Sequence, residues 1–179
     1  MKGEGLAKRE AARLHDIREQ FVSQWGVMGT QWGINRTMAQ IHALLMTSAE
    51  PMSTDEVMEA LAISRGNAHT NLKELVNWGL LRIVTRKGER KEFFEAEKDV
   101  WEMFRRIVEQ RKRRELDPAL LVVADCSDRT KGMKSKEGQA FHEQMVKLEE
   151  FVGFASKMGD RVGSLPHGKA MQLAMKIFG

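Results

Sequence analysis

Hydrophobic residues recur at helical spacing along most of the chain. Leu14, Ile17, Phe21 and Trp25 lie three or four positions apart, which predicts a helix over about residues 7–25. The next stretch, GVMGTQWG, contains three glycines that interrupt the pattern, so we expect a loop there.

The pattern resumes in a second helix, over about residues 36–48. Ser53 and Glu56 then have the spacing of a capping box, because each side chain can satisfy a free amide at the start of a short helix. After a tight turn, Ser64 can cap a fourth helix. Gly79 is a natural stop for that helix. These signals predict a pair of short helices joined by a turn.

The hydrophobic period changes after Gly79. Apolar and polar residues alternate over 81–86, as they do in a half-buried strand. Residues 87–90, Lys-Gly-Glu-Arg, favour a turn. The aromatic stretch 92–96 then predicts a returning strand, which completes a β-hairpin over 81–96.

The last part of the chain is expected to be helical. Asp99 and Glu102 repeat the capping-box spacing, and the helix that they open should run to about Glu115. Its expected buried residues are Val100, Trp101, Phe104, Ile107 and Val108.

Further helices should follow Asp117–Pro118, because proline suits a first helical position. The apolar stretch ALLVVAD favours helix, and the polar residues 127–136 favour a loop. A long helix over about 137–158 contains a heptad seam, and a last helix should start at Leu165. The seam consists of Phe141, Met145, Leu148, Val152 and Ala155.

Composition narrows the class of protein. The 179 residues are 42% hydrophobic, which suffices for a core, and the net charge of +4 modestly favours an anionic partner. A single cysteine, Cys126, excludes a disulfide within the chain. Residues 1–13 lack an apolar signal core, and no stretch has the length of a membrane span. We therefore expect a soluble, cytoplasmic protein.

The exposed face of the fourth helix suggests a reading helix for DNA. Such a helix must fit the major groove, so its outward side chains need hydrogen-bonding groups and little bulk. We predict DNA contacts from Ser64, Arg65, Asn67, His69, Thr70, Asn71 and Lys73.

Basic residues surround the tip of the hairpin that follows. Arg86, Lys87, Arg90 and Lys91 have the charge to contact the phosphate backbone or the minor groove. A solvated turn would be the better explanation of them if no reading helix preceded the hairpin. The basic run 111–114 either touches flanking DNA or is the exposed C-terminal end of a helix, and we favour the helix end.

The order of these elements carries a resemblance to a known family. The stretch INRTMAQIHALLMTSAEPMSTDEVMEALAISRGNAHTNLKELVNWGLLRIVTRKGERKEFFEAE resembles the winged-helix domain of the GbsR branch of the MarR superfamily. ISRGNAHTNLKELVNWGLL and KGERKEFFEAE are its most telling pieces, and DVWEMFRRIVEQRKRREL is similar to the helix that leaves this domain. The resemblance covers about residues 32–116.

The resemblance implies a dimeric, double-stranded-DNA-binding regulator that represses or activates nearby operons. It implies that Ser64, Arg65, Asn67, Thr70 and Asn71 meet DNA, with Arg90 and Lys91 in the wing. His69 departs from the family's small polar residues. Some members sense choline or related compatible solutes, although the identity of a ligand does not transfer safely.

Aromatic residues near the flanking helices offer a candidate effector site. Trp25, Trp32, Phe93 and Trp101 would form a cage for a quaternary ammonium compound through cation–π attraction. An aromatic core is the simpler interpretation, and we favour it. The five scattered histidines lack metal-ligand spacing, so we expect no metal and no cofactor.

We expect a mainly α-helical fold with a small β-hairpin wing, which is a winged helix-turn-helix with flanking dimerisation helices. Residues 1–33 should contribute to dimerisation, 34–97 should bind DNA, and 98–179 should form a helical dimerisation region. We expect a homodimeric transcriptional regulator, most simply a repressor, and no enzyme, because no catalytic motif is present. The alternative is a winged-helix module that binds protein instead of DNA.

Overall fold

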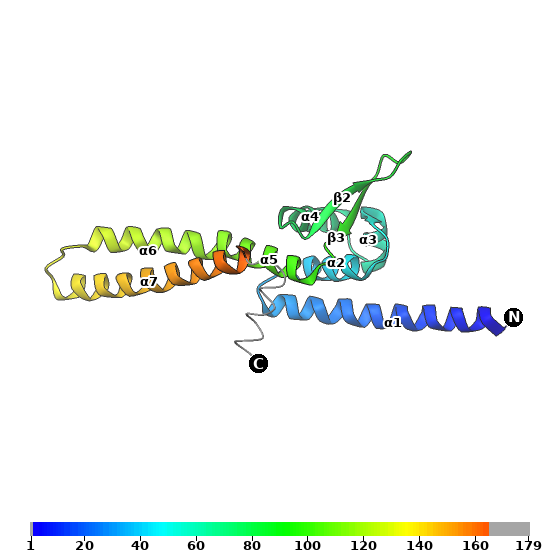
Figure 1. Ribbon diagram of the computed structural model, residues 1–179, viewed down its shortest axis with the longest axis horizontal. Helices are drawn as coiled ribbons and strands as arrows, with labels where there is room; N and C mark the ends of the chain where they lie inside the picture. Colours follow the sequence, from blue (N-terminus) through cyan, green and yellow to red (C-terminus); the bar gives the residue numbers. More distant parts are fainter. Residues whose placement is uncertain (1, 165–179) are drawn as a thin grey trace. The chain divides into compact units, whose positions relative to one another are not determined.

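The chain forms two units, Met1–Lys98 and Asp99–Gly179. Figure 1 draws the computed structural model, which describes residues 2–164. The last helix expected from Leu165 lies outside these residues. The first unit, here called the winged unit, consists of helices followed by a hairpin. Its elements are α1 (Lys2–Gln31), α2 (Arg36–Thr47), β1 (Met52–Ser53), α3 (Thr54–Leu61), α4 (Arg65–Asn77), β2 (Leu81–Thr85) and β3 (Glu92–Ala96).

Helix α1 continues through two glycines that were expected to end it. The expected loop at residues 26–33 is wrong, because α1 is helical to Gln31. A Cβ atom on Gly26 would lie 2.6 Å from the Gln40 side chain, and one on Gly29 would lie 2.5 Å from the Cβ of Ala39. The two glycines therefore allow α2 to pack closely against α1.

The helix-turn-helix begins as its capping signals predict. The Ser53 hydroxyl accepts the Glu56 amide, and the Glu56 carboxylate accepts the Ser53 amide, which confirms the capping box. Donation from the Ser53 amide and hydroxyl lowers the pKa of Glu56. Ala62 ends α3 in the left-handed conformation, with φ of 50°. The Ser64 hydroxyl then accepts the Asn67 amide at the start of α4, as predicted.

A three-stranded antiparallel sheet follows, in the order β1-β3-β2. The hairpin pairs Leu81 with Ala96 and Thr85 with Glu92, while Met52 pairs with Phe94. The two-residue strand β1 was not expected, because two residues are too few for a detectable alternation. The fold class is confirmed as a mainly helical winged helix-turn-helix.

The core of the winged unit lies between α2, α3, α4 and the sheet. Its most deeply buried large side chains are Ile41, Leu45, Val57, Leu72 and Leu75. The central strand β3 buries two consecutive residues, Phe93 and Phe94, which face opposite sides of the sheet. Ile83 is exposed, so the regular alternation predicted for β2 is only partly present.

The second unit, here called the helical unit, is a helical hairpin with a long first arm (Figure 1). Its elements are α5 (Val100–Arg111), the π-helical segment η1 (Lys112–Leu116), α6 (Asp117–Thr130) and α7 (Lys136–Ser164). The apolar stretch after Asp117 is helical, as predicted. The loop predicted for 127–136 is shorter, because α6 extends to Thr130. Asp99 caps α5 by accepting the amides of Trp101 and Glu102.

The basic run 111–114 lies inside this arm. The expectation that this run ends a helix is wrong, because the helical backbone continues through η1 into α6. Lys112 is largely buried and its ammonium forms ion pairs with Asp117 at 3.0 Å and Asp160 at 3.2 Å. Arg111 forms an ion pair with Glu115 at 3.0 Å. At least these two cations therefore stabilise the helical unit.

Several large apolar side chains of the helical unit are exposed. Val100 and Phe104 were expected to be buried, but both are exposed and Met103 is the buried residue of α5. Leu121, Val122, Phe151 and Phe154 are exposed as well.

Among the described residues, no helix is both long enough and apolar enough to cross a membrane.

Candidate nucleic-acid interface

Helix α4 exposes a polar face from its first turn onward. Ser64, Arg65, Asn67, His69, Thr70 and Lys73 are all exposed, as the sequence predicted. Ala68, Leu72 and Leu75 are buried on the opposite side. At 100° per residue, Gly66, Thr70 and Lys73 lie opposite these core residues. These three residues form the apex of the helix and are the farthest from the core.

Asn71 is a correction to the predicted face. Its side chain is only 7% exposed, so its expected outward position is wrong. The Asn71 amide donates to the backbone carbonyl of Asn67 at 2.8 Å and to the Asn67 side-chain oxygen at 2.7 Å. The Asn67 amide in turn lies 3.5 Å from the Thr37 hydroxyl of α2. Asn71 therefore helps to orient Asn67, which is exposed.

Arg65 is held by a carboxylate that the sequence analysis did not single out. Its guanidinium donates to Asp55 of α3 at 2.5 Å, and both side chains remain more than half exposed. An ion pair this exposed contributes little to stability. It does fix the direction of Arg65 at the start of α4. A ten-residue separation between an acid and an arginine has no periodic signature, so the sequence offered no signal for it.

The C-terminus of α4 sets the position of the wing. Gly79 adopts φ of 71°, its amide bonds the Val76 carbonyl at 2.8 Å, and the Leu80 amide bonds the Leu75 carbonyl at 2.9 Å. These bonds form a Schellman motif, which requires the left-handed residue that glycine provides most easily. The chain therefore reverses directly into β2, which places the hairpin next to α4.

The tip of the wing carries exposed cations. Lys87, Arg90 and Lys91 are exposed, and Gly88 adopts φ of 87° at the turn. Lys87 and Arg90 form no ion pair with any residue that the structure describes. Nearer the base, Arg82 pairs across the strands with Glu95 at 2.6 Å. Lys87 and Arg90 thus keep their positive charge without an ion-pair partner among the described residues, while Glu89 lies between them in the chain and Lys91 acts on Glu56.

Arg86 differs from the other basic residues of the wing. Its guanidinium lies 4.2 Å from the centre of the Phe93 ring and donates to the Pro51 carbonyl at 3.1 Å. Glu50 lies 3.9 Å away. These contacts join the end of β2 to the segment before β1. Arg86 is therefore engaged within the fold and is less available to a ligand than Lys87.

The aromatic cage, the less favoured interpretation of these residues, is not assembled in the winged unit. Phe93 is buried beneath Arg86, which agrees with the favoured interpretation of an aromatic core at this position. Trp25 packs on Phe21 with ring centres 5.4 Å apart, and Trp32 is exposed. Trp101 belongs to the helical unit and is half-buried. The choline-like effector stays a prediction.

Metal chemistry has no candidate site among the described residues. Groups of three or more histidine, cysteine, aspartate or glutamate side chains that could hold an ion are absent there. The candidate interface consists of the exposed polar face of α4 and the exposed cations of the wing that follows it.

Comparison with known proteins agrees with this geometry. Residues 32–92 match the model of the MarR family, which spans the helix-turn-helix and most of the hairpin. A solved structure described as a transcriptional regulator covers 80% of this chain and 98% of its own, with a TM-score of 0.54 and 20% identity. No curated protein matches the chain. Residues 32–92 are thus similar to the MarR family, and the fold is a winged helix-turn-helix of MarR type.

Proposed function

We propose that the protein is a sequence-specific, double-stranded-DNA-binding transcriptional regulator of the GbsR branch, acting as a homodimer and a repressor. The polar apex of α4 enters the major groove, and the wing contacts the phosphate backbone or the minor groove. One observation carries the proposal: a helix with an exposed polar face stands directly before a hairpin in which Lys87 and Arg90 form no ion pair with the described residues.

Charge supports the division of roles between helix and wing. Lys87 and Arg90 provide sequence-independent attraction to phosphates, which makes binding depend steeply on salt. The exposed side chains of Arg65 and Asn67 carry the groups that make bidentate contacts with base edges, which distinguish one base pair from another. The helix therefore provides specificity, and the wing provides affinity.

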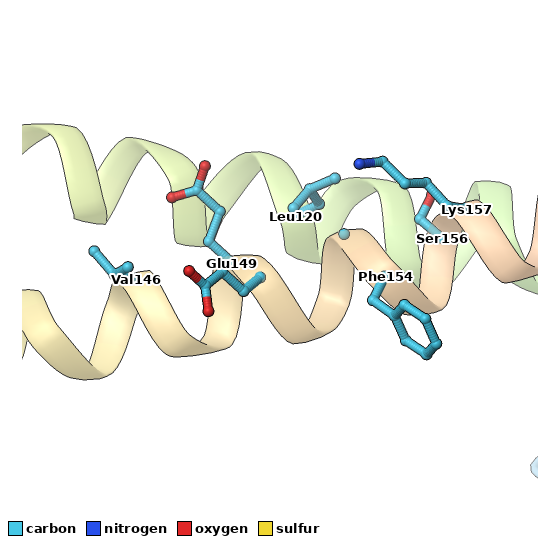
Figure 2. Close-up of a pocket in the computed structure, with 8 residues that line it drawn as sticks. Leu120, Val146, Glu149, Phe154, Ser156 and Lys157 are labelled. Carbon is cyan, nitrogen blue, oxygen red and sulfur yellow. The ribbon is translucent and has the colours of Figure 1, made fainter.

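Exposed apolar side chains of the helical unit support the homodimer. Leu121 and Val122 on α6, and Phe151 and Phe154 on α7, are each more than 60% exposed. An open groove of about 700 Å³ also lies on the helical hairpin beside Leu120, Val146 and Phe154, and charged residues such as Glu149 and Lys157 line it as well. Figure 2 shows the Phe154 ring pointing away from α6. Large exposed apolar side chains on both helices support an interaction site in this unit, and a second copy of the chain would cover them.

Selection of bound duplexes from random DNA tests the proposed function. We expect enrichment of a near-palindrome whose half-sites lie about ten base pairs apart, as two symmetry-related reading helices require. Arg65→Ala should reduce discrimination between the selected and a scrambled duplex by about 1–3 kcal/mol. Arg13→Ala removes the same charge from α1 and serves as the control.

Two results would contradict the proposal. The first is that the wild-type protein enriches no sequence. The second is that substitutions at Arg65, Asn67 and Thr70 leave the affinity for the selected duplex unchanged. Capture of a protein partner through the same face of α4 would instead favour the protein-interaction alternative.

A further inference from the structure

Gly66 occupies a position in α4 where the fold does not require glycine. It lies one residue inside the helix, its φ is not positive, and a Cβ built on it would meet nothing within 4 Å. Gly26 and Gly29 are different, because a neighbouring helix occupies the space beside them. Glycine within a helix is less stable than alanine. Helix stability therefore favours alanine over glycine at this position, and packing within the winged unit permits it.

The place of Gly66 on the helix gives the missing reason. It is exposed and lies at the apex with Thr70 and Lys73, in the first turn of α4. A Cβ atom there would point directly away from the core. In a helix that enters a groove by its N-terminal end, this position would meet the ligand first. Absence of a side chain lets the backbone approach a ligand more closely than any other residue permits.

We infer that Gly66 is a specificity-determining position, which lets α4 enter the major groove deeply enough for its neighbours to reach base edges. The inference rests on the proposed DNA-binding function. Arg65, Asn67 and Thr70 provide the hydrogen-bonding groups. Gly66 has no side chain, so the helix can approach the bases closely at this position. A methyl group at this apex holds the helix away from the groove floor, so base contacts are lost while contacts of the wing with phosphates persist.

The test compares wild-type protein with Gly66→Ala on two duplexes of equal length, one selected from random DNA by the wild type and one scrambled. Gly66→Ala should bind the selected duplex about 5- to 150-fold more weakly, the range that a mismatched base pair causes. Its affinity for the scrambled duplex should stay within about twofold. Its melting temperature should equal or exceed that of the wild type, because the methyl group meets no atom and favours the helix.

Gly5→Ala is the matched control. Gly5 is also helical and exposed, a Cβ there also meets nothing within 4 Å, and it lies in α1 instead of α4. It should leave both affinities unchanged. If Gly66→Ala binds the selected duplex as tightly as the wild type, the inference about Gly66 is wrong but the proposed function still stands. A wild-type protein that enriches no sequence would overturn the proposed function, and the inference with it.

Discussion

Arg86 and Lys87 are adjacent in the chain, but their side chains have different surroundings. Arg86 contacts the Phe93 ring and the Pro51 carbonyl, whereas Lys87 is exposed at the tip of the wing. Both residues were predicted from the sequence to contact DNA. A run of basic residues does not show which of them makes contacts within the fold. Substitution separates the two roles.

Arg86→Ala should lower the free energy of unfolding of the winged unit by about 1–2 kcal/mol, since it removes a cation–π contact and a charged hydrogen bond. Lys87→Ala should leave stability unchanged, weaken binding to all duplexes equally and reduce the salt slope by about one. Denaturant unfolding and titrations at several salt concentrations measure these effects. Equal stability of the two variants would contradict the role given to Arg86.

His42 introduces a pH dependence into the core of the winged unit. Its side chain is buried, its Nε2 atom has no hydrogen-bond partner within residues 2–164, and burial lowers its pKa from 6.5 to about 4. Between these two values, the unfolded chain binds a proton that the folded protein does not. The contribution to stability is therefore complete above pH 6.5 and falls as the pH decreases towards 4.

The loss should amount to about 3 kcal/mol, because each pKa unit corresponds to about 1.4 kcal/mol. Urea unfolding at pH 7 and pH 4.5 measures most of it. His42→Phe should reduce the difference between the two conditions, whereas His69→Gln, on the exposed face of α4, should preserve it. The explanation fails if His42→Phe retains the full pH dependence.

At the scale of elements, the contact between α1 and α2 depends on Gly26 and Gly29. Gly29→Ala should destabilise the winged unit by about 1–3 kcal/mol, because the new methyl group would overlap the Cβ of Ala39. Adding Ala39→Gly should recover part of this loss, and thermal melts of the four proteins in the cycle measure the coupling. Strictly additive effects would mean that the two positions do not share one contact.

Local signals explain which elements the sequence predicted. The capping box at Ser53, the cap at Ser64 and the stop at Gly79 act within six residues, so they could be recognised without knowing the fold. The hairpin at 81–96 was predicted for the same reason. Strand β1 was missed because its pairing partner Phe94 is about forty positions away in the chain.

The errors have a common physical origin. Gly26 and Gly29 indicate a loop when only neighbouring residues are considered, and a tight helix contact once α2 is present. Asn71 is polar and was therefore expected to be exposed, but its hydrogen bonds to Asn67 allow it to be buried. In each case a contacting residue determined the local structure or the burial, and the pattern of residues did not identify that contact.

At the scale of the whole molecule, the proposed dimer requires the exposed apolar residues of the helical unit. Replacing both Phe151 and Phe154 by Ser should shift the protein from dimer to monomer in sedimentation equilibrium. It should also weaken binding to a duplex with two half-sites more than to a single half-site. Glu143→Gln, an exposed substitution on the same helix, is the control. A double variant that remains dimeric would exclude this surface as the interface.

The π-helical segment η1 changes how the arm of the helical unit should be interpreted. A π-helical turn holds about one residue more than an α-helical turn, which rotates all later side chains by about 100°. The apolar positions of α5 and α6 therefore follow no continuous 3.6-residue repeat, although the backbone runs on without a break. Deleting one residue from 112–116 would restore a regular helix and turn Leu121 and Val122 to a new direction. The direction in which this surface faces is thus encoded by the number of residues in the arm as well as by their identity.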